Sequence, residues 1–168
     1  MSVAALAMRM GRPIAVILIA AAGTAACAIE IEEERDSDVQ GAVESMLIES
    51  AAEWNRGDLD GFMDDYLPSE NTTFVGSRGL VVGTDSIRAR YAPLFEPDAR
   101  RDSLRFEDIR VRRLAAVDAL ATARWILHRG DKITASGPFT LVLRRTSAGW
   151  RIIHDHSSSD SPPSSSGE

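Results

Sequence analysis

The feature that most limits the fold of this chain is a change in the spacing of its apolar residues. Up to residue 95, apolar side chains mostly recur at the spacing of one helix face. From residue 104 onward they alternate, as in strands with one buried face. A sheet of this size must cover its apolar face, and the helices are the only available cover. We therefore predict an α+β fold with three N-terminal helices packed on a strongly bent, mostly antiparallel sheet. Such a sheet closed by helices makes a cone-shaped barrel with a hollow interior.

Local signals set the expected limits of these elements. The first helix begins at a capping box formed by Ser37 and Gln40 and stops at Gly57, and Asp58 caps a second that ends by Pro68. Thr84 caps the third. Two short strands at residues 72–75 and 80–82 separate the second and third helices, and long strands follow at residues 104–114, 119–128, 133–145 and 150–156.

Two irregularities are expected within the long strands. Leu104 and Phe106 share one parity, whereas Ile109 and Val111 share the other, so a β-bulge is expected near residues 107–108. Residues 137–138 are Gly-Pro, and a bend is expected there because proline cannot donate to a central ladder.

The two ends of the chain differ in character from the middle. Residues 1–27 have two arginines, a short apolar run and a small-residue cleavage zone, as in an export signal; the alternative is a buried core helix. Cys27 follows Ala25-Ala26, as at the end of a bacterial lipobox, although Thr24 departs from that pattern, and plain secretion is the alternative. We predict export to the periplasm or cell envelope, with lipid attachment at Cys27. Residues 28–36 are expected to be an acidic tether, residues 37–158 the folded domain, and residues 159–168 a disordered Ser/Pro tail.

Composition and motifs exclude several functions. The formal net charge of −6 argues against nucleic-acid binding, and one cysteine excludes an internal disulfide framework and a multi-cysteine zinc site. Walker, dinucleotide-binding and zinc-protease motifs are absent from the sequence, so we predict no cofactor and no resident metal. Membrane contact is expected only through the N-terminal lipid anchor.

Three segments carry a resemblance to a known family. Residues 51–66 (AAEWNRGDLDGFMDDY), 79–95 (GLVVGTDSIRARYAPLF) and 136–158 (SGPFTLVLRRTSAGWRIIHDHSS) resemble the SnoaL-like branch of the nuclear transport factor 2-like superfamily. The resemblance covers essentially the whole predicted domain. It implies a mostly apolar pocket at the wide end of a cone, and many members are homodimers. Members include ketosteroid isomerases, polyketide cyclases, dehydratases and non-catalytic binding or association domains, so fold alone does not choose the activity.

The most informative polar cluster lies on the last predicted strand. On a regular strand His154 and His156 share the face of Trp150 and Ile152, and Asp155 lies on the opposite face. His154, His156 and Asp155 are the candidate catalytic residues, with the histidines as a general base or hydrogen-bond donor. Three alternatives stay open for the histidines: a structural role, a place in the pocket wall, or a metal site with His128 or an acid as third ligand. If the histidines face the pocket, Asp155 does not.

The candidate ligand-binding residues come from both halves of the domain. Arg124 and His128 share one strand face, and Arg124 is expected to meet a ligand carboxylate or to pair with Asp155 or Glu53. Trp125 points the other way, as a core or dimer contact. The full set of candidate ligand-binding residues is Trp54, Phe62, Tyr66, Phe74, Tyr91, Arg124 and His128.

Three functions are consistent with these observations. The preferred one is an exported, dimeric domain that binds a small apolar or amphipathic molecule. The second is an isomerase, cyclase or dehydratase that moves a proton next to a carbonyl. The third is a non-catalytic protein association module.

Overall fold

The computed structural model describes the backbone of residues 21–160 and the side chains of residues 38–160. The chain divides into two units, residues 1–34 and 35–168, and the second holds the folded domain. Residues 1–20 of the predicted export signal (1–27), the side chain of Cys27, and residues 161–168 of the predicted tail lie outside the described parts. Among the described residues, no helix combines the length and hydropathy needed to cross a membrane.

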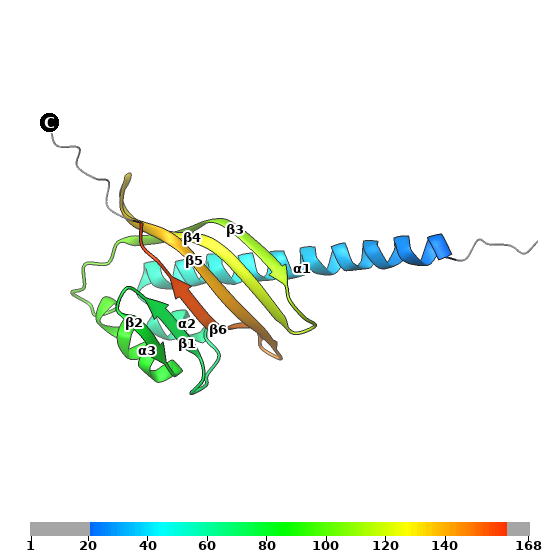
Figure 1. Ribbon diagram of the computed structural model, residues 1–168. Helices are drawn as coiled ribbons and strands as arrows, with labels where there is room; N and C mark the ends of the chain where they lie inside the picture. The colour runs from blue at the N-terminus through cyan, green and yellow to red at the C-terminus, as the bar shows by residue number, and fades with distance from the viewer. Residues whose placement is uncertain (1–20, 161–168) are drawn as a thin grey trace, which may run out of the picture. The chain divides into compact units, whose positions relative to one another are not determined.

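The domain is an α+β structure with a six-stranded mixed sheet (Figure 1). The elements in chain order are α1 (Ala21–Arg56), α2 (Leu59–Asp64), β1 (Thr73–Gly76), β2 (Gly79–Val82), α3 (Thr84–Tyr91), a 3-10 turn η1 (Ala92–Leu94), β3 (Ser103–Arg113), β4 (Asp118–Arg129), β5 (Lys132–Thr146) and β6 (Gly149–Ser157). The strand order is β2-β1-β6-β5-β4-β3, and all neighbours are antiparallel except β1 and β6. The predicted order of helices and strands is confirmed.

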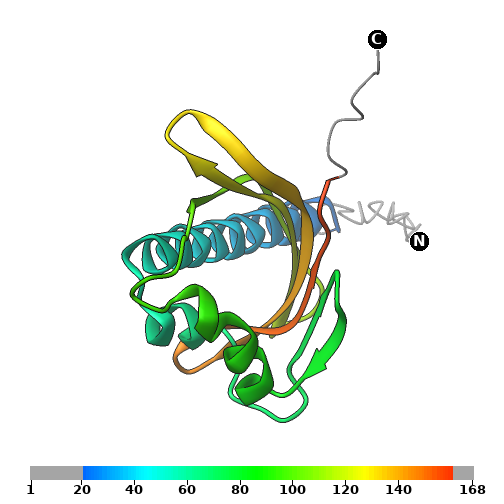
Figure 2. The same ribbon diagram turned by 90° about the vertical axis from the view of Figure 1, so that its left-hand side faces the viewer.

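The core lies between the helices and the concave face of the sheet, which curves around them (Figure 2). Val43 and Leu47 of α1 are buried, and so are Leu141 and Leu143 of β5. The predicted helical stripe and the predicted strand alternation therefore meet in one core, because each puts its apolar residues on a single face.

The predicted start of the first helix is wrong. Helix α1 begins at Ala21, so Ser37 lies inside it, and residues 28–36 are helical. Glutamate is a good helix former, and residues 32–34 are three glutamates in a row. The side chain of Gln40 does not complete a capping box. It accepts from the backbone N–H of Val111 (2.7 Å) and donates to the carbonyl of Ile109 (3.2 Å), which ties α1 to the sheet edge at β3.

The predicted bulge in β3 is confirmed. The β3–β4 register shifts between Glu107 and Arg110, and Asp108 has a positive φ of 55°. β5, in contrast, is a single strand through Gly137 and Pro138, which oppose Trp125 and Arg124 of β4. After β6 the chain continues along β5: Ser158 N–H donates to Pro138 O (3.0 Å) and Asp160 N–H donates to Ser136 O (2.8 Å).

Candidate functional site

A cavity of about 160 Å³ lies between the concave face of the sheet and the helices. Its walls are mostly apolar, and the hydroxyl and carboxyl groups among its lining residues come from α1, the segment that follows α2, α3 and β6. The lining residues are Leu47, Ser50, Trp54, Phe62, Tyr66, Tyr91, Leu104, Phe106, Trp125, Leu127, Phe139, Leu141, Ile152, Asp155 and Ser157. Asp155 supplies the one carboxyl group among the described lining residues.

A β-bulge in β6, which we did not predict, decides which side chains of this strand face the cavity. Leu143 pairs with Ile152, but the next residue back, Val142, pairs with His154, so Ile153 is the extra residue. The bulge reverses the alternation beyond it. Asp155 therefore shares the inner face with Trp150 and Ile152, and our prediction that His154 and His156 share that face is wrong.

Asp155 is buried and held by two hydroxyl donors. Tyr66 Oη donates to Asp155 Oδ2 (2.8 Å), and Ser157 Oγ donates to Asp155 Oδ1 (2.8 Å). Burial raises the pKa of Asp155 to about 6, because a carboxylate loses its hydration there. The bonds from Tyr66 and Ser157, and the nearby charge of His156, oppose that rise in the pKa. The side chain therefore changes protonation state close to neutral pH.

Tyr66 reaches Asp155 because the chain leaving α2 is bonded to β6. The backbone of Ile152 donates to Asp65 O (2.7 Å) and accepts from Leu67 N–H (2.9 Å), which places Tyr66 beside the strand. Tyr91 of α3 also lines the cavity, where its ring meets Phe62 edge-on at 5.0 Å between centroids. Burial raises the pKa of both tyrosines above its usual value, so both hydroxyls stay protonated and can donate.

Tyr66→Phe is expected to raise the pKa of Asp155 further above 6. The hydroxyl of Tyr66 favours the ionised carboxylate, so its removal favours the neutral acid. A ¹³C NMR titration of the Asp155 carboxyl carbon measures this shift. Ser157→Ala is expected to move the same resonance in the same direction. An unchanged or lower pKa in both variants would contradict the contacts described above.

Another buried acid, Asp65, lies at the end of α2. Its Oδ2 has no hydrogen-bond partner. Burial is the main cause that raises the pKa of Asp65 to about 7. The Ser50 hydroxyl and the charge of Arg151 lower this pKa, whereas the charges of Glu53 and Glu49 raise it. Asp65 is thus a carboxyl group held in an environment that disfavours its charge.

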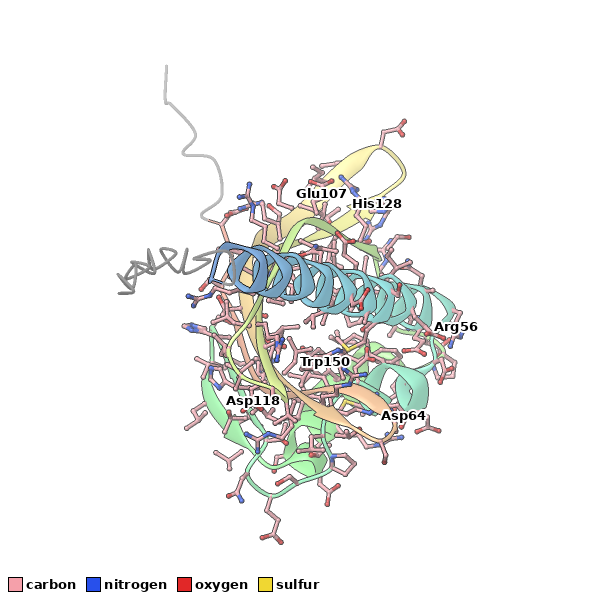
Figure 3. The ribbon with its side chains drawn as sticks, turned by 90° about the vertical axis from the view of Figure 1, so that its right-hand side faces the viewer. Arg56, Asp64, Glu107, Asp118, His128 and Trp150 are labelled. Atoms are coloured by element: carbon pink, nitrogen blue, oxygen red, sulfur yellow. The ribbon has the colours of Figure 1, made fainter. Side chains whose placement is uncertain are left out.

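Three residues predicted for the site lie elsewhere. Arg124 lies on the outer face of β4 and pairs with Asp160, not with Asp155, Glu53 or a group in the cavity. His128 lies on the β4–β5 hairpin (Figure 3), where its Nδ1 contacts Gly130 O at 3.1 Å. Phe74 is buried behind Tyr91, with 5.8 Å between ring centroids, and does not line the cavity.

The surroundings of the two β6 histidines fit the structural role that the sequence left open. His154 Nδ1 lies 2.7 Å from Thr73 Oγ1, a contact across the β1–β6 pair, and His156 is exposed. In the part of the chain that the structure describes, no three His, Cys, Asp or Glu side chains converge as a metal site would require.

Comparison with known proteins identifies the family. The family model described as a SnoaL-like domain matches residues 43–162. The chain belongs to the SnoaL-like family. A search of curated proteins found no match.

Solved structures agree with this assignment of the SnoaL-like domain. An NTF-2-like protein of unknown function from Shewanella oneidensis is 30% identical, with a TM-score of 0.62, over 70% of this chain and 97% of that one. An NTF2-like superfamily protein from Salmonella enterica is 17% identical, with a TM-score of 0.59, over 79% and 99%. A ketosteroid isomerase-like protein from Erwinia carotovora is 21% identical, with a TM-score of 0.55, over 73% and 96%. The last two likenesses concern the fold alone.

The SnoaL-like domain also has cavity residues that sequence analysis missed. Ser50 and Ser157 gave no signal, because serines at helix and strand positions are common on surfaces. Trp125 was expected in the core or at a dimer contact, and its opposite parity to Arg124 was predicted correctly. Its indole Nε1 donates to Ser158 O (3.0 Å) at the cavity wall.

Proposed function

We propose that this domain binds a small, mostly apolar molecule with one hydrogen-bonding group in a cone-shaped pocket. The observation that carries the proposal is the apolar cavity of about 160 Å³ with one buried carboxyl group, Asp155, in its wall. Ligand sites are typically apolar concavities with a few placed polar groups. A dry apolar cavity of about 150 Å³ accepts benzene, so the enclosed part suits a group about the size of one ring.

The protonation state of Asp155 sets the polar preference of the pocket. Above pH 6 the carboxylate accepts a hydrogen bond, so a ligand hydroxyl is favoured. Below pH 6 the neutral acid has a proton to donate, so a ligand carbonyl is favoured. The ligand class that fits both the walls and Asp155 is therefore a ring or short chain with a hydroxyl or carbonyl group.

Asp155→Asn is expected to weaken phenol binding at pH 8 by about tenfold or more, because a hydrogen bond to a charged group contributes about 1.5–3 kcal/mol. Binding of toluene, which has no hydroxyl, is expected to change much less. Titration calorimetry with both probes measures the difference. Asp64→Asn, which removes an exposed carboxyl at the end of α2, is the matched control. Equal losses for phenol and toluene would mean that the substitution damages the cavity rather than a polar contact.

Proton transfer next to a carbonyl is the second candidate function. It is favoured by one observation, a cavity carboxyl group whose pKa of about 6 suits a general base at neutral pH. In such a step the Asp155 carboxylate takes a proton from the carbon beside the carbonyl and returns it to a carbon of the resulting enolate. Exchange of the α-protons of cyclohexanone in D₂O, followed by ¹H NMR, tests this. Faster exchange in the presence of the unmodified protein, but not of Asp155→Asn, would support catalysis. If the protein does not accelerate exchange, ligand binding remains the proposed function.

We also propose export, lipid attachment at Cys27 and a homodimer, on the grounds of the N-terminal sequence and the resemblance given above. Native mass spectrometry of the protein from its own host reports subunit number, acylation and retained ligand together. A monomer without a bound molecule would contradict the preferred function. An inert association module would need an extensive apolar outer sheet face. The outer face is mixed: Arg110, Thr122 and Thr140 form one row, beside a row that contains Leu120 and Val142, so it is less apolar than that alternative requires.

A further inference from the structure

A second hollow of about 280 Å³ lies at the end of the domain where the β3–β4 and β5–β6 hairpins meet α1. It is lined by Asp38, Val39, Ala42, Arg113, Ala116, Arg145 and Trp150. None of these residues lines the cavity that contains Asp155. Figure 3 shows Trp150 between α1 and the β5–β6 hairpin, on the side of the molecule where Asp118 also lies. The hollow is therefore a separate place on the molecule.

The charges that line this hollow are unbalanced. Neither Arg113 nor Arg145 has an acidic group within 4.0 Å among the described residues, whereas the neighbouring Arg144 pairs with Asp118 (2.8 Å). Asp38 contributes one negative charge against these two positive ones. A hollow with two guanidinium groups that pair with no described acid suits an anion.

A side-chain bond holds Arg113, and a backbone bond places Arg145 beside the neighbouring hairpin. Arg113 Nε donates to Ala115 O (3.1 Å), and the backbone N–H of Arg145 donates to Val117 O (2.7 Å). The second bond joins the two hairpins, so the distance between the arginines is set by the fold. Less side-chain freedom of Arg113 is then lost when an anion binds.

Trp150 adds an apolar wall. Most of its side chain is buried, and its indole N–H makes no hydrogen bond to another described residue. The other two tryptophans both donate, Trp54 to Asp102 O (2.9 Å) and Trp125 to Ser158 O (3.0 Å). Val39 and Ala42 of α1 add apolar surface on the opposite wall.

We propose that this hollow is a second ligand site, which takes an oxyanion, a phosphate or carboxylate group, attached to a short apolar stem. Arg113 and Arg145 contact the oxyanion, and the stem lies along Trp150, Val39 and Ala42. A lipid headgroup and a free organic phosphate share this chemistry. The proposal does not depend on the function of the first cavity.

Titration calorimetry with octyl phosphate, below its critical micelle concentration, tests the proposal. Arg113→Gln and Arg145→Gln are each expected to weaken binding about tenfold, the effect of losing roughly 1.4 kcal/mol. Asp38→Asn is expected to tighten binding severalfold, because it removes the opposing charge. Arg144→Gln, which removes an arginine already paired with Asp118, is the matched control and is expected to change binding little. Octanol, which lacks the phosphate, is expected to bind far more weakly than octyl phosphate.

Two further experiments show where the anion comes from and which of the two cavities it occupies. Sedimentation with phosphatidylcholine vesicles, with and without phosphatidylglycerol, tests for a lipid headgroup, and inorganic phosphate alone tests the need for a stem. Phenol is not expected to compete with octyl phosphate, because it occupies the other cavity. The proposal is overturned if neither octyl phosphate nor the anionic vesicles bind, if the double arginine variant binds as the unmodified chain does, or if phenol displaces octyl phosphate. Circular dichroism confirms that each variant is folded.

Discussion

Asp65→Asn is expected to raise the free energy of unfolding at pH 8 by several kcal/mol, at most about 4. The pKa of Asp65 is about 7 in the folded chain, against an ordinary value of 3.8. Between these values the folded state holds a proton that the unfolded chain has released, so stability falls as pH rises from about 4 to 7. Above pH 7 the folded domain carries a buried charge with one unpartnered oxygen. Asparagine has a similar shape and no charge, so that cost is removed.

Urea unfolding at pH 5 and pH 8 measures this effect. The substitution is expected to be nearly neutral at pH 5, where Asp65 is protonated, and stabilising at pH 8. Asp64→Asn is the control, because Asp64 is the adjacent residue in sequence but is exposed (Figure 3). Equal stability of Asp65→Asn and the unmodified chain at pH 8 would contradict this account and show that the Asp65 carboxylate is compensated in the folded state.

This cost has a consequence for the first cavity. Asp65 immediately precedes Tyr66, and its carbonyl accepts from Ile152, the residue beside the bulge that turns Asp155 inward. The buried charge of ionised Asp65 therefore lies on the same backbone segment that positions Tyr66 against Asp155. The backbone bonds at Ile152 therefore connect the segments that carry the two buried carboxyl groups, whose pKa values of about 7 and about 6 both lie near neutral pH.

The architecture could be predicted because local and tertiary preferences agree along most of the chain. The stripe that includes Val43 and Leu47 has helical spacing and is buried, and the alternation of Phe139, Leu141 and Leu143 defines one face of β5. The β3 bulge was visible because apolar residues continue on both sides of it and change parity. Agreement of this kind is what makes a sequence specify one fold.

The β6 bulge was missed because only one side of it carries an apolar pattern. Trp150 and Ile152 define the inner face, and the adjacent pair of isoleucines at 152–153 was the only sign of a phase slip. Beyond them the residues are polar, so alternation could not tell whether His154 or Asp155 faces inward. The sequence also could not show which face of β4 lines the cavity. Trp125 and Arg124 were correctly placed on opposite faces, but only the packing of the sheet shows which face is concave.

Gly137→Ala is expected to lower the free energy of unfolding by about 3 kcal/mol or more. A Cβ atom at this position would lie 1.9 Å from the carbonyl oxygen of Ser158, so one backbone segment must move. If residues 158–160 are displaced, the domain loses the bonds from Ser158 N–H to Pro138, from Asp160 N–H to Ser136 and from Trp125 to Ser158 O. Each contributes about 1 kcal/mol, which gives a similar total.

The control for this substitution is Gly41→Ala in α1, where a Cβ atom meets nothing within 4 Å. It is expected to stabilise the domain by about 0.5–1 kcal/mol, since alanine is the better helix former. Thermal and urea unfolding compare the two variants. A stable Gly137→Ala variant would mean that the chain beyond Ser157 does not pack on β5.

A double-mutant cycle separates the clash from any other effect of the alanine. In a chain that ends at Ser157, the oxygen that collides with the new Cβ is absent, so Gly137→Ala is expected to cost little more than the truncation alone. Both variants release the Trp125 indole from its acceptor at the cavity wall. They are therefore expected to weaken phenol and toluene binding alike, in contrast to Asp155→Asn, which acts mainly on phenol. Additive stability losses in the cycle would contradict this account and show that Gly137 is required for a reason internal to β5.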